Sequence, residues 1–257
     1  MRVLIVYAHP HAGSFCHALL ERVETGLRDG GHTFEVIDLH RARFDPVFRN
    51  RDYNQFMHES LPDDVIAQAD LKQALLARAG GPVRRAVAKR WMGGKTDREI
   101  VRALGRRTPR DVRRHQEKVA RAEGLIFIAP VYWMGLPAIL KGWFERVFAY
   151  GFAYTLDRDG WNGDLRGRVP LLTQQKGLVI TPTFFTRDEY ERGWQQAMDT
   201  IVCDWGLKMA GVKETEHVYF YAVGAVDRVT RLGYLDLAHS LGRDFAHANA
   251  PATPAIV

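Results

Sequence analysis

Five short apolar segments, separated by longer stretches of helical character, constrain the fold of this chain more than any other feature. They are residues 3–8, 34–39, 125–129, 178–181 and 217–223. Near-continuous apolar runs of this length are typical of parallel strands that are buried on both faces. Strands that alternate with helices predict right-handed crossovers and a doubly wound five-stranded α/β sheet. Its ligand site is then expected at the carboxyl ends of the strands, in the loops 9–15, 130–136 and 181–187.

The expected helices have recognisable ends. Ser14 is the predicted N-cap of the first helix, and Gly30 and Gly31 are its stop signal. Pro137 fits the first turn of another helix, since proline lacks an N–H that the first turn would leave unpaired. Further helical patterns cover 109–122, 137–150, 187–207 and 226–247, and the tail 248–257 is expected to fray.

The positive charge of the chain is local. The 257 residues carry a formal net charge of +6, but residues 58–118 alone hold 15 Lys and Arg against 8 Asp and Glu. The remainder of the chain is therefore close to neutral. Residues 58–107 also interrupt the alternation of strands and helices, with breaks at Gly80-Gly81-Pro82 and Gly93-Gly94. We expect one domain over 1–257, with a basic helical insertion at about 58–107 after the second strand.

Several protein classes are excluded by composition. No apolar run approaches the roughly 18–20 residues that span a membrane, and residues 1–10 do not resemble a secretory signal. The two cysteines, Cys16 and Cys203, form no CxxC pair, so neither a disulfide framework nor a thiolate metal site is expected. The histidines show no metal-binding spacing. The chain reads as a cytoplasmic protein without a bound metal.

Two of the three predicted loops carry residues suited to a ligand. Neither GxGxxG nor GxxxxGK[ST] occurs, but residues 9–15 (HPHAGSF) precede a helix whose first amides can hold a phosphate. An ordinary capped turn explains this loop equally well.

Residues 130–137 (PVYWMGLP) bring bulky side chains to the end of a strand. They offer backbone donors and an apolar surface to an isoalloxazine ring, although an aromatic packing cluster is the simpler alternative.

A longer segment around the second loop carries a specific resemblance. Residues 130–148 (PVYWMGLPAILKGWFERVF), with 151–154 (GFAY), 4–9 (LIVYAH) and 44–46 (FDP), closely resemble the NAD(P)H:quinone oxidoreductase (DT-diaphorase-like) family of flavodoxin-like flavoproteins. The match covers about 1–57 and 108–185. It implies a flavodoxin-like fold, a homodimer with the site at its interface, and bound FAD, with FMN in shorter relatives. It also implies ping-pong transfer of a hydride from NAD(P)H through the flavin to a quinone-like or other conjugated acceptor.

The resemblance also implies roles for individual residues. Tyr190 and Trp133 are the implied catalytic residues, while Tyr154, Phe152 and Phe184 are implied to contact the acceptor. The implied cofactor-binding residues lie on all three loops and are His9, Ser14, Phe15, Pro130, Val131, Tyr132, Trp133, Met134, Thr181, Pro182 and Thr183.

The third loop departs from the family pattern. Residues 181–185 (TPTFF) replace a Thr-Thr-Gly-Gly turn, so that Pro182 removes an amide donor and Phe184 cannot approach a flavin as glycine does. Tyr190 matches the tyrosine of a proton relay credited to the family, but Gln195 stands where its histidine is expected and cannot titrate. A specialised biosynthetic flavin reductase that acts on a polycyclic aromatic intermediate is therefore an alternative. The sequence does not decide FAD against FMN, NADH against NADPH, or the natural acceptor.

The insertion allows three interpretations. Residues 95–105 and 108–115 are similar to the helix-turn-helix of LuxR-type response regulators, which suggests a redox-responsive DNA-binding regulator. The second of these helices also has to pack on the sheet, so nucleic acid is not the expected partner. The other two interpretations are a solvated helical elaboration with Trp91, Ile100 and Leu104 packed inward, and a lid or dimer arm whose arginines attract anions.

Overall fold

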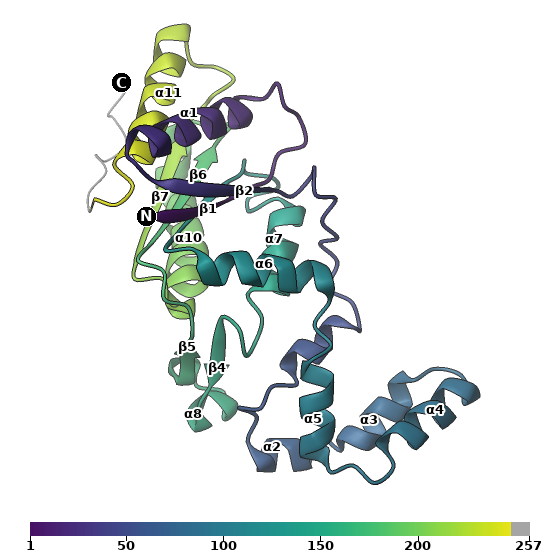
Figure 1. The fold of residues 1–257 in the computed structure, drawn as a ribbon. Helices are drawn as coiled ribbons and strands as arrows, with labels where there is room; N and C mark the ends of the chain where they lie inside the picture. Colours follow the sequence, from purple (N-terminus) through teal and green to yellow (C-terminus); the bar gives the residue numbers. More distant parts are fainter. Residues whose placement is uncertain (248–257) are drawn as a thin grey trace.

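The structure, a computed structural model, describes residues 1–247, so the predicted fraying of the tail falls outside the described residues. Five strands form one parallel sheet in the order β2-β1-β3-β6-β7 (Figure 1). Their bounds are Arg2–Tyr7 for β1, Thr33–Asp38 for β2, Gly124–Ile128 for β3, Lys176–Pro182 for β6 and Glu214–Phe220 for β7. The predicted doubly wound sheet is confirmed.

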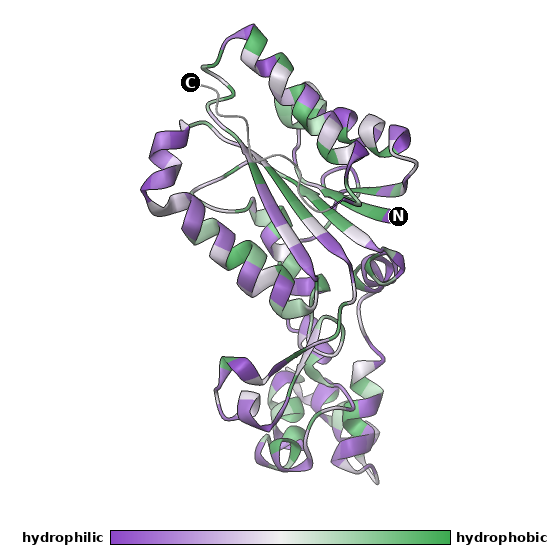
Figure 2. Ribbon diagram, turned by 90° about the vertical axis from the view of Figure 1, so that its left-hand side faces the viewer, coloured by the Kyte–Doolittle hydropathy of each residue, from purple (hydrophilic) through white to green (hydrophobic). Residues whose placement is uncertain are grey.

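Helices cover both faces of this sheet. On one face, α1 (Phe15–Asp29) and α11 (Arg228–Arg243) pack against Val3 and Ile5. On the other, α6 (Arg110–Arg121) and α7 (Ala138–Val147) pack with residues 202–212 against Leu4 and Val6. Figure 2 shows the resulting contrast between hydrophobic strands and helices with hydrophilic outer faces. Alternate residues of β1 thus enter different cores, as the period of a strand requires.

Several helix boundaries differ from the sequence predictions. Ser14 caps α1 as expected, its Oγ accepting the His17 N–H at 3.2 Å. Pro137 is the N-cap of α7 rather than part of its first turn, and the helix ends at Val147 instead of residue 150. The single helix expected over 187–207 was wrong. Gly193, with a φ of 124°, interrupts the segment, which runs as α9 (Arg187–Glu189), a π-helix (Tyr190–Trp194), α10 (Gln195–Asp199) and a second π-helix (Thr200–Leu207).

Short elements join the main ones and were not predicted. Strands β4 (Tyr154–Leu156) and β5 (Arg168–Pro170) form an antiparallel pair after α7. Between them lie α8 (Arg158–Trp161) and a 3₁₀ turn (Leu165–Gly167). A further 3₁₀ turn (Lys208–Ala210) precedes β7.

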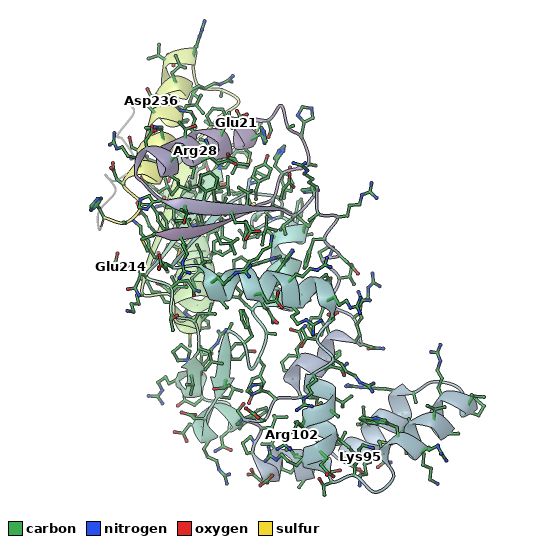
Figure 3. All side chains as sticks on the ribbon, viewed as in Figure 1. Glu21, Arg28, Lys95, Arg102, Glu214 and Asp236 are labelled. Atoms are coloured by element: carbon green, nitrogen blue, oxygen red, sulfur yellow. The ribbon has the colours of Figure 1, made fainter. Side chains whose placement is uncertain are left out.

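The predicted insertion is a helical lobe, by which we mean residues 52–107, lying below α6 and α7 in Figure 1. The lobe shares its apolar cluster with Tyr150 of the body; Ile100 and Leu104 face into this cluster as expected, and Trp91 packs at its margin. Figure 3 shows side chains across its surface, including those of Lys95 and Arg102. Its elements are a 3₁₀ turn (Asp52–Phe56), α2 (Asp63–Gln68), α3 (Leu71–Arg78), α4 (Pro82–Met92) and α5 (Asp97–Gly105).

A buried ion pair joins the lobe to the sheet layers. The Arg146 guanidinium on α7 donates to Asp52 Oδ1 at 3.0 and 3.1 Å, to Asp111 Oδ2 at 2.8 Å, and to the Asp45 carbonyl at 2.6 Å. Arg146 and Asp52 are fully buried. Buried charges are stable only when they are paired and hydrogen-bonded. This contact between body and lobe, which we call the Arg146 joint, therefore requires both the arginine and the acceptors around it.

Helix α6 belongs to the sheet core. Its Val112 and Val119 side chains are fully buried in the cluster beneath β1 and β3. This is the helix that the helix-turn-helix interpretation would place in a DNA groove. The sheet already covers the apolar face of this helix. The helix therefore cannot leave the core to lie in the major groove as a recognition helix.

Candidate functional site

The first loop at the carboxyl edge presents unpaired amides. The His11 N–H donates to His9 Nδ1 at 3.1 Å, and the Gly13 N–H donates to His11 Nδ1 at 3.0 Å, so the two imidazoles shape the turn. Burial lowers the pKa of His9, which favours its neutral ring. Within residues 1–247, no hydrogen bond occupies the N–H groups of Ala12, Phe15 or Cys16. Free amides at a helix N-terminus, where the helix dipole is positive, form a cradle for a phosphate.

A second unpaired donor lies at the end of β1, beneath this loop. The Tyr7 hydroxyl is buried near the Ser14 side chain and makes no hydrogen bond of good geometry among the described residues. Burial raises the pKa of Tyr7 to about 12, so the group stays a neutral hydroxyl. An orphaned buried hydroxyl is costly, which makes this edge of the sheet suited to a polar ligand.

The second loop contains a strained tight turn. The Tyr132 N–H donates to the Gly135 carbonyl at 3.0 Å, and the Gly135 N–H donates back at 3.2 Å. Between them, Trp133 and Met134 have φ values of 45° and 69°, the combination of a type I′ turn. Type I′ turns usually have the sequence Asn-Gly, because a positive φ costs most other residues about 1 kcal/mol or more in conformational energy. Here the strain displays the Trp133 ring, which is 98% exposed.

The third loop is more closed than the family pattern implies. Thr181, Pro182 and Thr183 are all buried, whereas Phe184 and Phe185 are exposed. The Thr183 hydroxyl donates to the Phe185 carbonyl at 2.8 Å, and its N–H donates to the Phe220 carbonyl at 2.8 Å. The hydrogen bonds of Thr183 therefore hold this turn closed. Its exposed edge carries the rings of Phe184 and Phe185, where the family pattern has glycines.

A buried network that the sequence analysis missed supports Thr181. His217 on β7 places Nε2 2.8 Å from Thr181 Oγ1 and Nδ1 2.8 Å from Asp199 Oδ1. The Tyr219 hydroxyl donates to the same Asp199 oxygen at 2.7 Å. Burial lowers the pKa of His217 and raises that of Tyr219, so both are neutral. In the tautomer that donates to Asp199, Nε2 accepts the Thr181 proton. The Thr181 oxygen then remains only an acceptor for a ligand.

Tyr190, an implied catalytic residue, lies behind the loops in a tyrosine cluster. It is 1% exposed, and its ring lies 5.7 Å from those of Tyr219 and Tyr221. Burial raises its pKa. Val131 of the second loop packs against this cluster. Gln195, at the position expected for histidine, accepts the Tyr221 hydroxyl at 2.6 Å through Oε1. The structure thus brings Tyr190 next to the second loop, and it holds Gln195 at the same cluster through Tyr221.

The implied acceptor residues separate into two places. Phe184 lies on the rim of the third loop, whereas Phe152 and Tyr154 follow the far end of α7. A helix of ten residues is about 15 Å long, and Pro130–Met134 precede its other end. The Tyr154 ring stacks under the Arg168 guanidinium at 4.1 Å, and Phe152 lines a cavity against the lobe. Within one chain, Tyr154 shares a pocket with Leu136 at the end of the second loop, but neither Tyr154 nor Phe152 lies with Phe184.

The loops fit a flavin on observations of this structure. Three free amides and an orphaned hydroxyl suit the phosphate side, and an exposed indole on a rigid turn offers an apolar surface for a planar ring. Both cysteines are buried with free thiols, and burial raises the pKa of each to about 12, which argues against thiol chemistry. Across the described residues, no cluster of potential metal ligands and no helix able to cross a membrane is present.

Comparisons with known proteins identify the family to which the fold belongs. The family of the flavodoxin-like fold matches residues 1–232. NAD(P)H dehydrogenase (quinone) 1 of Cavia porcellus is 34% identical over 154 residues, which cover 60% of this chain and 45% of that protein. The Rattus norvegicus protein of the same name is 31% identical over 176 residues, covering 68% and 53%. The chain therefore spans about half the length of these curated relatives.

A solved structure matches over nearly the whole chain. The NAD(P)H:quinone oxidoreductase from Methanothermobacter marburgensis superposes with a TM-score of 0.66 at 27% sequence identity. The match covers 97% of this chain and 99% of that one.

Proposed function

This chain belongs to the flavodoxin-like fold family, and we propose that it is a flavin-dependent NAD(P)H oxidoreductase. Its acceptor is a quinone or another conjugated molecule that takes two electrons. The overall reaction converts NAD(P)H, a proton and the quinone into NAD(P)⁺ and the hydroquinone. The names of the similar proteins support this activity, as does the match of a quinone oxidoreductase structure to 97% of the chain.

The observation that carries the proposal is the strained Tyr132–Gly135 turn beside the free amides of α1. Strain persists where the surroundings enforce it, and it concentrates at functional sites. Here it holds the Trp133 ring in water at the carboxyl end of β3, where an α/β fold binds its ligand. An apolar ring displayed next to a phosphate cradle matches the two ends of a flavin.

Each part of the site then has a role. Hydride acceptance and release are the chemistry that a bound flavin supplies. The N–H groups of Ala12, Phe15 and Cys16 bind its phosphate, and Trp133 and Met134 cover its ring and exclude water. Thr181, whose proton is held by His217, accepts a hydrogen bond from the cofactor. We propose FAD as the cofactor, and FMN satisfies the same contacts.

The acceptor side needs a second copy of the chain. Tyr154 follows the far end of α7, where it contacts an acceptor across a homodimer interface, whereas Phe152 faces the cavity against the lobe. A cytoplasmic location remains a prediction that agrees with the two free cysteines.

The direct test is the cofactor. We expect the purified protein to be yellow, to release FAD or FMN on denaturation, identified by mass, and to be bleached by NADPH or NADH under anaerobic conditions. Readdition of a benzoquinone should restore the colour. A colourless protein that neither contains nor binds flavin would refute the proposal.

The placement of Trp133 has a matched control. Trp133→Ala removes the indole that covers the ring, so we expect weaker flavin retention or a raised KM. Trp205→Ala removes another exposed tryptophan, 55% accessible on the segment Thr200–Leu207, and should change neither. Equal flavin content and kinetics in both variants would contradict the placement.

A specialised reductase of polycyclic aromatic intermediates is the second candidate. The exposed Phe184 and Phe185 rings, 5.4 Å apart, extend the apolar rim of the site beyond what a single small ring would cover. Turnover on a polycyclic quinone that exceeds turnover on benzoquinone, and that falls in Phe184→Ala, would favour this candidate. Equal turnover on both acceptors would exclude it.

A further inference from the structure

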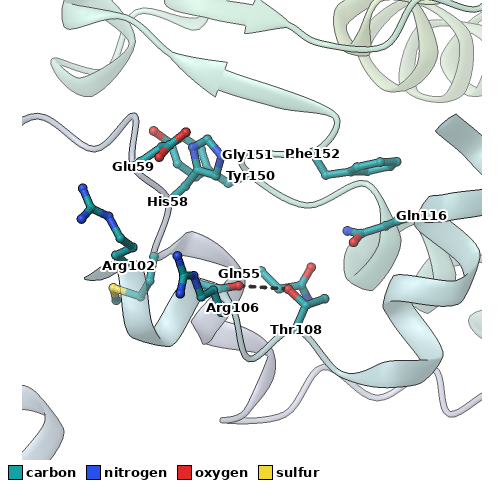
Figure 4. Close-up of a pocket in the computed structure, with 12 residues that line it drawn as sticks. Gln55, His58, Glu59, Arg102, Arg106, Thr108, Gln116, Tyr150, Gly151 and Phe152 are labelled. Carbon is teal, nitrogen blue, oxygen red and sulfur yellow. Dashed lines mark hydrogen bonds between the residues drawn. The ribbon is translucent and has the colours of Figure 1, made fainter. Parts of the chain in front are cut away.

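A cavity of about 520 Å³ separates the lobe from the segment that follows α7. The three loops of the flavin site contribute none of its lining residues. Figure 4 shows that its walls come from the start of the lobe, the end of α5, the middle of α6 and residues 150–152. Its volume lies within the range of small-molecule sites, which often form between structural units.

The wall beside residues 150–152 is closely fitted. Gly151 has a φ of 79°, and a Cβ there would come within 2.5 Å of the His58 ring. The His58 Nδ1 is 2.9 Å from Ser60 Oγ, which in turn is 2.9 Å from the Tyr150 hydroxyl. These contacts fix the lobe against the body at one side of the cavity and leave the rest open.

One end of the cavity is cationic. Arg102 and Arg106 line it from α5 and the turn after it, and Figure 4 shows both side chains on the same side. Neither guanidinium makes an ion pair or a side-chain hydrogen bond within the part of the chain that is described. Other arginines of the lobe are engaged, as Arg98 is by Asp63. Two free guanidinium groups in one cavity suit a phosphate, which they bind through paired N–H donors.

The opposite end suits a planar ring with polar edges. Phe152 and Gln116 lie there, across the cavity from the arginines (Figure 4). Gln116 Nε2 donates to the Val147 carbonyl at 3.1 Å, which leaves its Oε1 as an acceptor. Gln55, 6% exposed, also lines the cavity, and neither its side-chain nitrogen nor its oxygen has a partner in the described chain. Unpaired buried amides are costly, so a ligand that supplies a donor and an acceptor would stabilise this wall.

A carboxylate completes the wall. Glu59 lines the cavity near His58, and its side chain forms no ion pair among residues 1–247. A carboxylate there would repel a bare anion but accepts hydrogen bonds from the hydroxyls of a ribose.

We propose that this cavity binds a phosphorylated nucleoside. Its phosphate pairs with Arg102 and Arg106, its ribose hydroxyls donate to Glu59, and its base stacks on Phe152 with an amino group donating to Gln116. The site is separate from the flavin loops and requires neither flavin nor hydride transfer. It gives the basic lobe a recognition role beyond general attraction of anions.

Calorimetric titration of the purified holoprotein tests the ligand class. AMP is the probe, and adenosine and inorganic phosphate represent its two parts. We expect AMP to bind at least about tenfold more tightly than either part, because charge-assisted and ring contacts act together. If AMP does not bind at millimolar concentration, or if phosphate binds as tightly as AMP, the proposal is wrong.

Matched variants test the residues. Arg106→Gln should weaken AMP binding about tenfold, the loss of one charge-assisted contact. Arg90→Gln, on an exposed arginine of α4 outside the cavity, changes the net charge equally and should leave the affinity unchanged. Equal weakening in both variants would show non-specific electrostatics and overturn the site.

The ribose contact has its own control. Glu59→Gln should reduce the preference for AMP over 2′,3′-dideoxy-AMP, while an unchanged preference would remove Glu59 from the site. Flavin content is measured in every variant. AMP binding that fails while flavin content is normal refutes this inference alone, whereas a protein without flavin that still binds AMP refutes only the proposed oxidoreductase function.

Discussion

The body of the protein and its lobe bury apolar residues in different ways. The sheet separates two continuous cores, in which Ile5 and Val6 on neighbouring positions of one strand reach opposite faces. The lobe has a single small cluster, and its α-helices are 6 to 11 residues long. Helices this short are marginal without tertiary packing. The lobe therefore depends on its contacts with the body, whereas the body has cores of its own.

The Arg146 joint gives the largest expected effect. Arg146→Met leaves the buried Asp52 carboxylate without its cationic partner, although its Oδ2 still accepts the Arg49 N–H, and such a loss costs about 3–5 kcal/mol. Arg158→Met removes a second ion pair between body and lobe, but Arg158 and Asp64 are exposed at 72% and 47%, so the cost should stay below about 1 kcal/mol. Urea denaturation of the two variants measures the difference. Equal losses of unfolding free energy in the two variants would mean that the Arg146 ion pair contributes no more to stability than the exposed one.

Matched core truncations compare the two regions directly. Ile5 and Ile100 are both fully buried, and truncation of such a side chain to alanine costs about 2–5 kcal/mol. We expect Ile5→Ala to lower the global stability and Ile100→Ala to open only the lobe. Hydrogen–deuterium exchange resolves the two cases. If Ile100→Ala accelerated exchange in β1 and β3 as much as in α5, body and lobe would be one cooperative unit.

Matched helix caps give a smaller effect. Ser14 Oγ caps α1, and Thr96 forms a capping box with Glu99 at the start of α5. Replacing either with alanine should cost about 1 kcal/mol. Only Ser14→Ala should also weaken flavin retention, because it loosens the amides of the phosphate cradle. Thr96→Ala with the same loss of flavin would contradict that assignment.

The smallest expected effect is a pH dependence confined to the body. Burial lowers the pKa of His115 to about 4, and its Nδ1 accepts the Trp143 Nε1–H at 2.9 Å. The unfolded chain binds a proton near pH 6.5 and the folded chain only near 4, so stability is complete above about pH 6.5 and falls as the pH drops toward 4. Between pH 7 and 6, the loss should be under about 1 kcal/mol. His115→Gln should flatten this slope; an unchanged slope would assign it to other groups.

The sequence predicted the body better than the lobe for a physical reason. Apolar runs such as residues 125–129 mark strands buried on both faces, and they located all five strands of the sheet. The lobe has mixed, arginine-rich helices; of the three side chains expected to pack inward, Ile100 and Leu104 are buried and Trp91 is partly buried. Arg146 was missed because its charge is neutralised by Asp52, which lies 94 residues away in sequence. The break in the predicted helix 187–207 had one local signal, Gly193.

The candidate site was predicted only in part. The loops at 9–15 and 130–136 lie at the carboxyl edge as the strand pattern required, and the resemblance selected their residues. The strain at Trp133 was not predictable, since nothing in the sequence specifies a positive φ for that residue type. His217 was also missed, because its link to Thr181 exists only when β6 and β7 lie side by side. The roles of Tyr190, Phe152 and Tyr154 remain predictions.

The joint at Arg146 also bears on how the chain could be shortened. One guanidinium nitrogen contacts both the Asp45 carbonyl, before the lobe, and the Asp111 carboxylate, after it. The two ends of the inserted segment are therefore neighbours in space, and a linker of a few residues, at about 3.5 Å each, can replace it. Gain or loss of the segment in a single genetic step would leave every strand pairing intact. In that sense the lobe is an insertion between two neighbouring points of the body, which the Arg146 side chain holds together.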